Sequence, residues 1–274
     1  MTSSQADKAS QFRALHEGPE AFVIANVWDA GSARMMAGLG FPALATSSAA
    51  SAGVLGRRDG RIRRDEALMQ AQAICGAVAL PVSADLEKGF GAAPEAAAQT
   101  IALAAEAGLV GGSIEDATGD PDAPIFDFAL SVERMAAAAE AARKLPFPFM
   151  LTGRCENYLR GRLDLDDTIR RLNAYEAAGA NVLMAPGLTD LEAVRSVCAA
   201  IKKPFNFMAG IKGKSFTVDE LAAAGVKRVS LAASLYRAAM TAAFNAAKEV
   251  RGGGTFGYLD ASLPAPEMNA FFEG

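Results

Sequence analysis

The sequence predicts a (β/α)8 barrel, the TIM-barrel fold. Apolar runs of about five residues alternate eight times with longer Ala-rich stretches of helical period. Eight such units in about 230 residues fit one closed barrel, and strands buried on both faces explain the unbroken apolar runs. The alternative is a doubly wound open sheet, but no G-x-G-x-x-G follows the first apolar run, as its dinucleotide-binding form would require.

The expected elements follow one another without a change in composition, which predicts a single domain over residues 1–274. A polar N-terminal helix comes first. Strands are then expected at residues 22–26, 42–47, 81–85, 110–114, 148–152, 181–185, 204–208 and 227–231. Helices are expected at residues 30–39, 65–79, 94–107, 128–144, 166–178, 189–201, 217–224 and 233–250.

Turn residues separate these elements at regular intervals. In "GFP", "GLV", "GAN" and "GVK", a glycine ends a helix and leads into the next strand, as a C′ cap does. Asp190 and Thr217 are suited to cap the helices that follow them. The tail after Arg251 begins with glycines and ends with aromatic residues. Two placements are open for the C-terminal helix and this tail: against their own barrel, or exchanged between subunits.

Composition excludes several classes of function. A formal net charge of −4 argues against nucleic-acid and anionic-membrane partners. No signal peptide and no apolar run of membrane-spanning length is present, and three cysteines without metal spacing suit a reducing cytoplasm, so a cytoplasmic protein is expected. Because His16 is the only histidine and lies in the polar N-terminal helix, Ser-His-Asp chemistry and His-based zinc sites are not expected.

Acidic side chains end two neighbouring strands. Asp85 and Glu87 precede a Gly-x-Gly turn rather than a helix, so helix capping explains them poorly. Glu115 and Asp116 close the next apolar run, where Asp116 either joins the others or binds backbone. The carboxyl ends of barrel strands meet at one mouth, so these acids are expected to converge. An oxygen-only ligand set predicts a hard divalent cation, Mg²⁺, with Mn²⁺ as the alternative.

Other polar residues also collect at the carboxyl ends of strands, whereas the amino ends carry mostly Gly, Pro and Ala. Trp28 follows the first strand, Thr46 to Ser48 end the second, and Asn206 lies in the seventh. Arg154 follows the fifth and is suited to balance the acids or to pair with a substrate carboxylate or phosphate. This asymmetry is typical of an enzyme barrel.

Six segments together resemble the isocitrate lyase/phosphoenolpyruvate mutase superfamily over about residues 10–250. They are "NVWDAGSARMM", "TSSAASAGVLGRRDG", "SADLEKGFG", "GGSIEDATGDP", "LTGRCENY" and "PFNFMAG". The resemblance implies a Mg²⁺-dependent (β/α)8 barrel that makes or breaks C–C or P–C bonds in 2-oxo or 2-hydroxy acids. It also implies a homotetramer in which a C-terminal helix is exchanged between subunits.

The resemblance further implies roles for single residues. The metal set is Asp85, which would bind Mg²⁺ directly or through water, with Glu87 and Glu115 holding metal-bound waters. The catalytic set is Arg154, which would neutralise charge on the reacting oxygen, with Glu115 and Asp59, which would orient the metal's water shell. The substrate-binding set is Ser47, the backbone N–H groups of Ser48 and Ala49, and the side chains of Trp28, Asp85, Arg154 and Asn206.

Departures from the family narrow the reaction. The loop after the fourth strand reads "ATGDPDAPIFDF", without the Cys and His of isocitrate and methylisocitrate lyases, and Ser113, Glu87 and Pro186 replace other lyase residues. The sequence therefore predicts a Mg²⁺-dependent lyase or decarboxylase that cleaves a C–C bond in a small 2-oxo or 2-hydroxy dicarboxylic acid, through a metal-bound 2-oxo acid or enolate. The alternatives are a phosphonopyruvate-type P–C mutase or hydrolase, and a catalytically silent barrel that binds 2-oxo acids.

Overall fold

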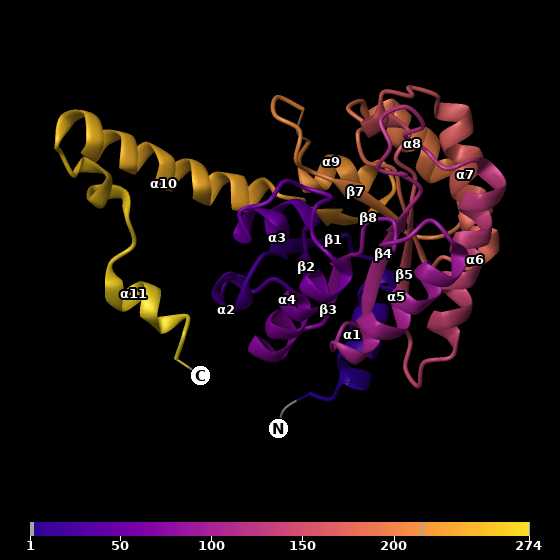
Figure 1. The fold of residues 1–274 in the computed structure, drawn as a ribbon, viewed down its shortest axis with the longest axis horizontal. Helices are drawn as coiled ribbons and strands as arrows, with labels where there is room; N and C mark the ends of the chain where they lie inside the picture. The colour runs from indigo at the N-terminus through magenta and orange to yellow at the C-terminus, as the bar shows by residue number, and fades with distance from the viewer. Residues whose placement is uncertain (1–2, 215, 274) are drawn as a thin grey trace.

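Eight parallel strands form a closed barrel in the computed structural model, which describes residues 3–214 and 216–273 (Figure 1). Each strand pairs with the next along the chain, and β8 pairs with β1 to close the ring. The strands are β1 Phe22–Val27, β2 Leu44–Thr46, β3 Val82–Asp85, β4 Gly111–Glu115, β5 Met150–Arg154, β6 Val182–Met184, β7 Phe205–Met208 and β8 Val226–Ser230. The predicted barrel fold is confirmed.

A helix follows each strand, as the sequence predicted, and all of these helices except the last surround the barrel (Figure 1). They are α2 Ala30–Gly38, α4 Arg64–Ala77, α5 Pro94–Glu106, α6 Phe128–Arg143, α7 Leu165–Ala178, α8 Leu191–Ala200, α9 Val218–Ala223 and α10 Ser234–Gly253. Outside this series lie α1 Gln5–Glu17, α3 Ser48–Val54, α11 Ala265–Ala270 and the 3-10 turns Tyr158–Arg160 and Gly257–Ala261. The predicted caps are confirmed, since Asp190 accepts from the N–H of Ala193 and Thr217 accepts from that of Glu220.

Two predicted strand boundaries are wrong in a way that affects the site. β4 and β5 both begin and end one or two residues later than predicted, so that Glu115 and Arg154 pair as the last residues of their strands. The strand backbone, rather than a loop, therefore fixes where these two side chains begin. The short helix α3 was not predicted, and it ends β2 early because Ser47 is its N-cap.

Helix α1 closes the amino end of the barrel. Its Phe12 is fully buried and packs in a small core with Phe22 and Met150. His16 is buried as well, which corrects the expectation of a polar helix, since one face of α1 turns inward. Its ring stacks edge-on against Phe12 and Phe22.

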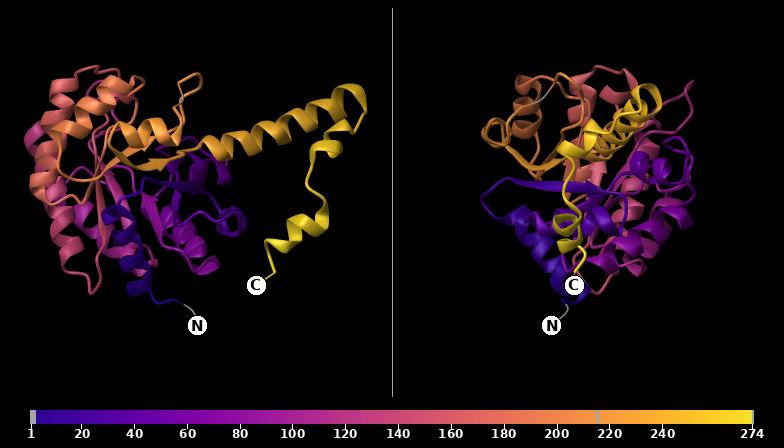
Figure 2. Two further views of the ribbon diagram at one scale, coloured as in Figure 1. Left: turned by 180° about the vertical axis from the view of Figure 1, so that it is seen from behind. Right: turned by 90° about the vertical axis from the view of Figure 1, so that its left-hand side faces the viewer.

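The C-terminal arm, residues 234–273, leaves the barrel. Helix α10 projects away from it, and the chain then turns back so that α11 lies nearer to α2 (Figures 1 and 2). No residue of α10 is buried, and Met240 and Phe244 on it are more than half exposed. The tail end contacts its own barrel, where the Arg34 guanidinium donates to the Phe272 carbonyl at 2.9 Å. None of the described helices is long and apolar enough to cross a membrane.

Candidate active site

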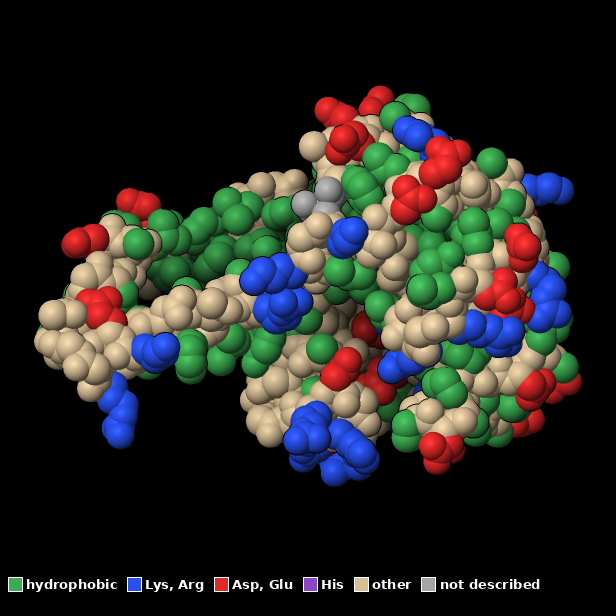
Figure 3. All heavy atoms as spheres, turned by 90° about the horizontal axis from the view of Figure 1, so that it is seen from above, with side chains coloured by type: hydrophobic (Ala, Val, Ile, Leu, Met, Phe, Trp, Pro, Cys, Tyr) green, Lys and Arg blue, Asp and Glu red, His purple; other side chains and the backbone are tan. Residues whose placement is uncertain are grey.

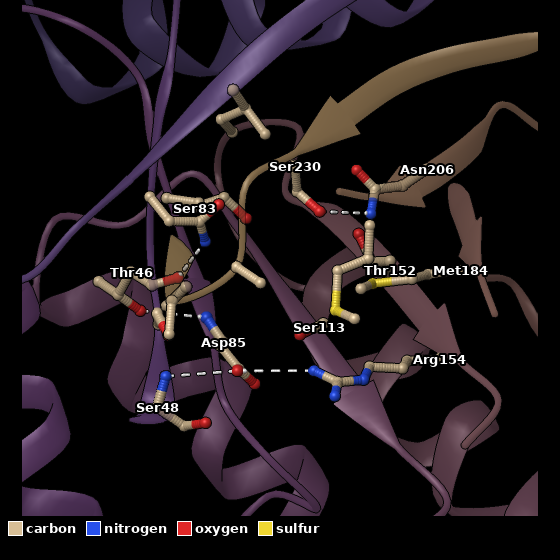
Figure 4. Close-up of a pocket in the computed structure, with 18 of the residues that line it drawn as sticks. Thr46, Ser48, Ser83, Asp85, Ser113, Thr152, Arg154, Met184, Asn206 and Ser230 are labelled. Carbon is tan, nitrogen blue, oxygen red and sulfur yellow. Dashed lines mark hydrogen bonds and ion pairs between the residues drawn. The ribbon is translucent and has the colours of Figure 1, made fainter. Parts of the chain in front are cut away.

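A cavity of about 200 Å³ lies inside the barrel and opens at the carboxyl ends of the strands (Figure 4). It continues into a wider hollow of about 1090 Å³ on the surface, in which acidic side chains show between basic ones (Figure 3). Ser48, Asp59 and Arg154 border both spaces. The inward-facing residues of the cavity are mainly small and polar, and include Thr46, Ser83, Ser113, Thr152, Asn206 and Ser230.

Asp85 ends β3 at the cavity wall. Its backbone N–H donates to the hydroxyl of Thr46 on β2 at 3.1 Å, which aligns the ends of the two strands. One carboxylate oxygen accepts from the N–H of Glu87 at 3.2 Å, and the other accepts from the N–H of Ser48 at 3.3 Å. Asp85 therefore joins the third strand to the first turn of α3, and its side chain keeps an exposed fraction of 18% toward the cavity.

Arg154 lies at the centre of the acids. Its Nε is 2.6 Å from Glu156 and 3.4 Å from Glu115, and its Nη1 is 3.5 Å from Asp85. Burial alone would lower the pKa of this guanidinium, but the charges of Glu156, Glu115 and Asp85 raise it well above its usual value. Arg154 is therefore a permanent cation held by acids at the ends of three neighbouring strands, and Figure 4 shows its contact with one of them, Asp85.

Glu156 was not assigned a role from the sequence, although it lies two residues beyond Arg154. It is fully buried, and Arg160 contacts its second oxygen at 3.0 Å. Glu115 lies on the other side of Arg154, and burial raises its pKa well above the usual value, with Arg154 opposing the shift. The sequence did not show that Glu156 would form an ion pair with Arg154, two residues before it.

Asp116, whose role was open, belongs to the support of the site. One oxygen accepts from the backbone N–H of Glu156 at 2.7 Å, and the other accepts from the hydroxyl of Tyr175 at 2.6 Å. Arg171 lies 3.2 Å from the same oxygen. Asp116 thus binds backbone and fixes the turn that carries Glu156, and it does not face the cavity.

Glu87 has an unusual backbone and an unusual carboxyl group. Its φ is 48°, in the left-handed region that a side chain rarely adopts, and such strain collects at functional sites. Burial, followed by the charges of Asp85 and Asp59, raises the pKa of Glu87 to about 7. Its Oε1 is buried and has no hydrogen-bond partner among the described residues. A buried oxygen of this kind needs a ligand, a water or a proton.

Acidic side chains gather around Arg154 at the mouth. They are Asp85, Glu87, Glu115 and Glu156, whereas the outer part of the hollow also carries arginines, namely Arg61, Arg63 and Arg64. Within the described residues, no three acid, His or Cys side chains are close enough to form a bare metal cage. The donors therefore fit a hard divalent ion that keeps most of its waters, as Mg²⁺ does.

The remaining predicted residues have different placements. Ser47 accepts from the N–H of Ala50 as the cap of α3, and Ser48 and Ala49 line the cavity. Asp59 is exposed at the rim, and Asn206 lies deep in the cavity. Trp28 does not line the cavity; its ring packs edge-on against Tyr236 of α10 at 5.4 Å. The structure thus brings together every predicted site residue except Trp28.

The loop of residues 117–127 lies over one side of the mouth. Ala117 and Ile125 form a short antiparallel bridge, and the Thr118 hydroxyl donates to the Ala123 carbonyl at 2.6 Å. The ammonium group of Lys88 donates to the Thr118 carbonyl and joins this loop to the acidic segment after β3.

Comparisons with known proteins agree with one another. The model of the phosphoenolpyruvate phosphomutase family matches residues 12–251. A crystal structure from Burkholderia cenocepacia J2315, whose description goes no further than a suggested lyase/mutase, has a TM-score of 0.96 at 56% identity and covers 98% of this chain and 97% of that chain.

Two further relatives have names that state an activity. An oxaloacetate decarboxylase of Marinomonas sp. (strain MWYL1) is 31% identical over 268 residues, which are 95% of this chain and 91% of the relative. The structure of an oxaloacetate acetylhydrolase with its product oxalate has a TM-score of 0.88 at 25% identity and covers 98% of this chain and 94% of that chain.

Proposed function

Because the chain belongs to the phosphoenolpyruvate phosphomutase family, we propose that it is a magnesium-dependent lyase or decarboxylase. The bond cleaved is a C–C bond in a small 2-oxo or 2-hydroxy dicarboxylic acid. The observation that carries the proposal is Arg154, held among three carboxylates at the mouth of a small polar cavity. The names of two relatives, both of which refer to oxaloacetate, support C–C chemistry over P–C chemistry.

The residues that would hold Mg²⁺ are Asp85, Glu87 and Glu115. The buried oxygen of Glu87, which has no hydrogen-bond partner among the described residues, and the closeness of Asp85 and Glu115 to Arg154 support this set. The ion would supply Lewis-acid stabilisation of negative charge on substrate oxygens. Mn²⁺ prefers similar oxygen ligands and is expected to substitute.

The protein's own residues supply orientation and charge. The Ser47 region, with the N–H groups of Ser48 and Ala49, binds the carboxylate next to the 2-oxo group. With a 2-oxo diacid, CO₂ leaves, the electron pair of the broken C–C bond passes to the 2-oxo-acid fragment as an enolate that then takes a proton from water, and charge grows on the 2-oxygen. With a 2-hydroxy diacid, the 2-hydroxyl first loses its proton to water, and the electron pair of the broken bond passes to the other fragment, which is then protonated. In both cases negative charge lies on the 2-oxygen during the reaction. The guanidinium of Arg154, already fixed by its ion pairs, stabilises that charge without reorganising. The loop of residues 117–127 excludes water from the reacting atoms.

The exposed face of α10 supports a second part of the proposal, a homotetramer with exchanged arms. Met240 and Phe244 lie four residues apart on one face of α10, and both are exposed in the single chain. An apolar stripe of this kind on an isolated helix marks a protein–protein contact. Trp28 and Tyr236 would then anchor the base of the arm rather than the substrate.

The test is incubation of the purified protein with Mg²⁺ and five acids: oxaloacetate, 2-methylisocitrate, isocitrate, 2,3-dimethylmalate and phosphonopyruvate. Products are followed by proton and phosphorus NMR, with Asp85→Ala as the inactive variant. Asp166→Ala, an exposed acid on α7, is the matched control. Formation of a 2-oxo acid by C–C cleavage in the wild type and in the control, but not in Asp85→Ala, is the expected result.

Other outcomes select the alternatives. Release of phosphate from phosphonopyruvate would replace C–C chemistry with P–C chemistry. Binding of 2-oxo acids that requires Mg²⁺, without turnover of any substrate, would identify a silent binding barrel.

A further inference from the structure

A buried arginine forms the floor of the cavity. Arg228 lies in the middle of β8, is only 5% exposed and lines the cavity below the predicted metal residues. Lys227 and Arg228 are consecutive in a strand, so they point to opposite faces, and Lys227 turns outward to the carbonyl of Glu20. The inward charge was not predicted, although two consecutive cations in a barrel strand force one of them inside.

In residues 3–214 and 216–273, no carboxylate pairs with this guanidinium. It uses three of its five N–H groups, and all three partners are neutral. Nε donates to the Asn206 amide oxygen at 2.7 Å, Nη2 donates to the Thr152 hydroxyl at 3.0 Å, and Nη1 contacts Nε2 of His16 at 3.2 Å. The buried Arg171, by contrast, pairs with Asp116 and Asp167. The buried Arg134 also has neutral partners, but these are backbone carbonyls of a loop and it does not line the cavity.

His16 must be neutral here. Its Nδ1 is 2.7 Å from the carbonyl of Phe12, which can only accept, so Nδ1 carries the hydrogen. Its Nε2 then accepts from Arg228, which can only donate. Burial, followed by the charge of Arg228, lowers the pKa of His16 to about 3. Among the described residues, Arg228 therefore has no counter-charge on its His16 side either. Burial lowers the pKa of the Arg228 guanidinium to about 9.

An unpaired buried cation is costly unless something pairs with it. We infer that Arg228, with Thr152, Asn206 and Ser230, forms an anion subsite at the cavity floor that binds the second acidic group of the substrate. The inference rests on the proposed function in taking the mouth as the place where the 2-oxo-acid end binds. It identifies Arg228 as the residue that selects diacids over monoacids.

The dimensions fit this role. Thr152, which contacts Arg228, and Arg154 both face inward from β5 and lie two residues apart, a rise of about 6.6 Å. The carboxyl carbons of an extended four-carbon diacid are about 3.9 Å apart, and the outer oxygens of its two carboxylates are about 6 Å apart, close to this rise. The cavity of about 200 Å³ can hold on the order of ten waters, hence a small organic acid.

The test compares ligands in the full-length protein with Mg²⁺ present. Calorimetry measures the binding of two ligands. One is 3,3-difluorooxaloacetate, a diacid analogue of oxaloacetate, and the other is 2-oxobutanoate, a four-carbon monoacid. The wild type is expected to bind the diacid at least tenfold more tightly, since charge-assisted hydrogen bonds are the strong ones. A ratio near one in the wild type would overturn the inference without any variant.

Two variants localise the effect. Arg228→Met is expected to abolish the diacid preference and leave monoacid affinity within about threefold, whereas Arg228→Lys should keep part of the preference. Thr152→Asp places a carboxylate beside the guanidinium, so it should remain folded and also abolish the preference. An unchanged preference in folded Thr152→Asp, or equal losses for both ligands, would contradict an anion subsite.

The two proposals fail separately. Absence of turnover with every substrate would remove the proposed lyase but leave the diacid preference measurable by binding. Turnover with no diacid preference would keep the lyase and remove the subsite.

Discussion

Arg154 illustrates how a single residue can balance a site at the barrel mouth. Three carboxylates approach it within 3.5 Å, and the shortest contact is with the buried Glu156. Asp116, Tyr175 and the backbone behind Glu156 hold that partner in place. The guanidinium is thus oriented before a substrate arrives, which is what transition-state stabilisation by fixed charges requires.

Removing the partner of this arginine tests that description. Glu156→Ala is expected to lower the free energy of unfolding by about 3 kcal/mol, because it breaks a buried ion pair. It should also reduce kcat by more than tenfold with a smaller change in KM, since Arg154 loses its orientation. Urea denaturation and steady-state kinetics measure the two effects. Glu133→Ala, at an exposed position of α6, is the control, and equal behaviour of the two variants would refute the role of Glu156.

His16 gives a pH dependence of stability at the opposite end of the barrel. Its pKa is about 3 when folded and near 6.5 when unfolded. At pH 7 the imidazole is neutral in the folded state and mostly neutral in the unfolded state, so it contributes little pH dependence. Between pH 6.5 and pH 3 only the unfolded chain takes up the proton, so the free energy of unfolding falls by at most about 1.4 kcal/mol per pH unit.

The measurement is urea denaturation from pH 7 to pH 4 for the wild type and His16→Gln. The wild type should lose stability more steeply than the variant below pH 6.5, whatever their difference at pH 7. Parallel slopes would show that His16 is protonated in the folded protein.

Among the secondary-structure elements, those of the C-terminal arm leave apolar side chains exposed in a single chain. Helix α10 buries none of its residues, and a helix of mixed polarity gains most of its stability from packing. The end of the tail touches α2, yet the apolar stripe of α10 remains exposed. An exchanged arm in a homotetramer would cover this stripe.

A charge on the stripe should therefore dissociate the assembly. Phe244→Glu is expected to shift the mass in solution toward the monomer, because it places an acid in an apolar contact. Asn245→Glu adds the same charge one position along the helix, on the polar side, and should leave the assembly intact. Sedimentation velocity reads both variants, and a wild-type monomer at micromolar concentration would contradict the tetramer directly.

At the scale of the whole molecule, the barrel was predictable because its signals are local and repeated. Eight apolar runs and the glycine caps after α2, α5, α7 and α9 follow from hydrophobic period and turn chemistry. Strand ends were less certain, since pairing between strands sets them. For this reason Glu115 and Arg154 were expected just beyond their strands, and they lie instead at the last paired positions of β4 and β5.

The site was predictable only in part, for a related reason. Acids at strand ends could be expected to meet, because the topology brings those ends together. The partners of Arg228 could not, because contacts among His16, Thr152 and Asn206 depend on which side chains face inward at one level of the barrel. The packing of Trp28 could not be predicted either: its position suggested the mouth, and in the structure Tyr236 from a distant helix packs against its ring.

The central claim is that the carboxylates at the mouth support Mg²⁺-dependent C–C cleavage. The most direct measurement is the rate of oxaloacetate loss with Mg²⁺, above the background with heat-inactivated protein, for wild type, Asp85→Ala and Asp166→Ala. We expect turnover by the wild type and by Asp166→Ala, and we expect that EDTA abolishes this turnover and added Mg²⁺ restores it. The rate for Asp85→Ala should be at least 100-fold lower, which corresponds to about 2.7 kcal/mol in the activation barrier. Equal rates for wild type and Asp85→Ala would contradict the proposed role of the carboxylates.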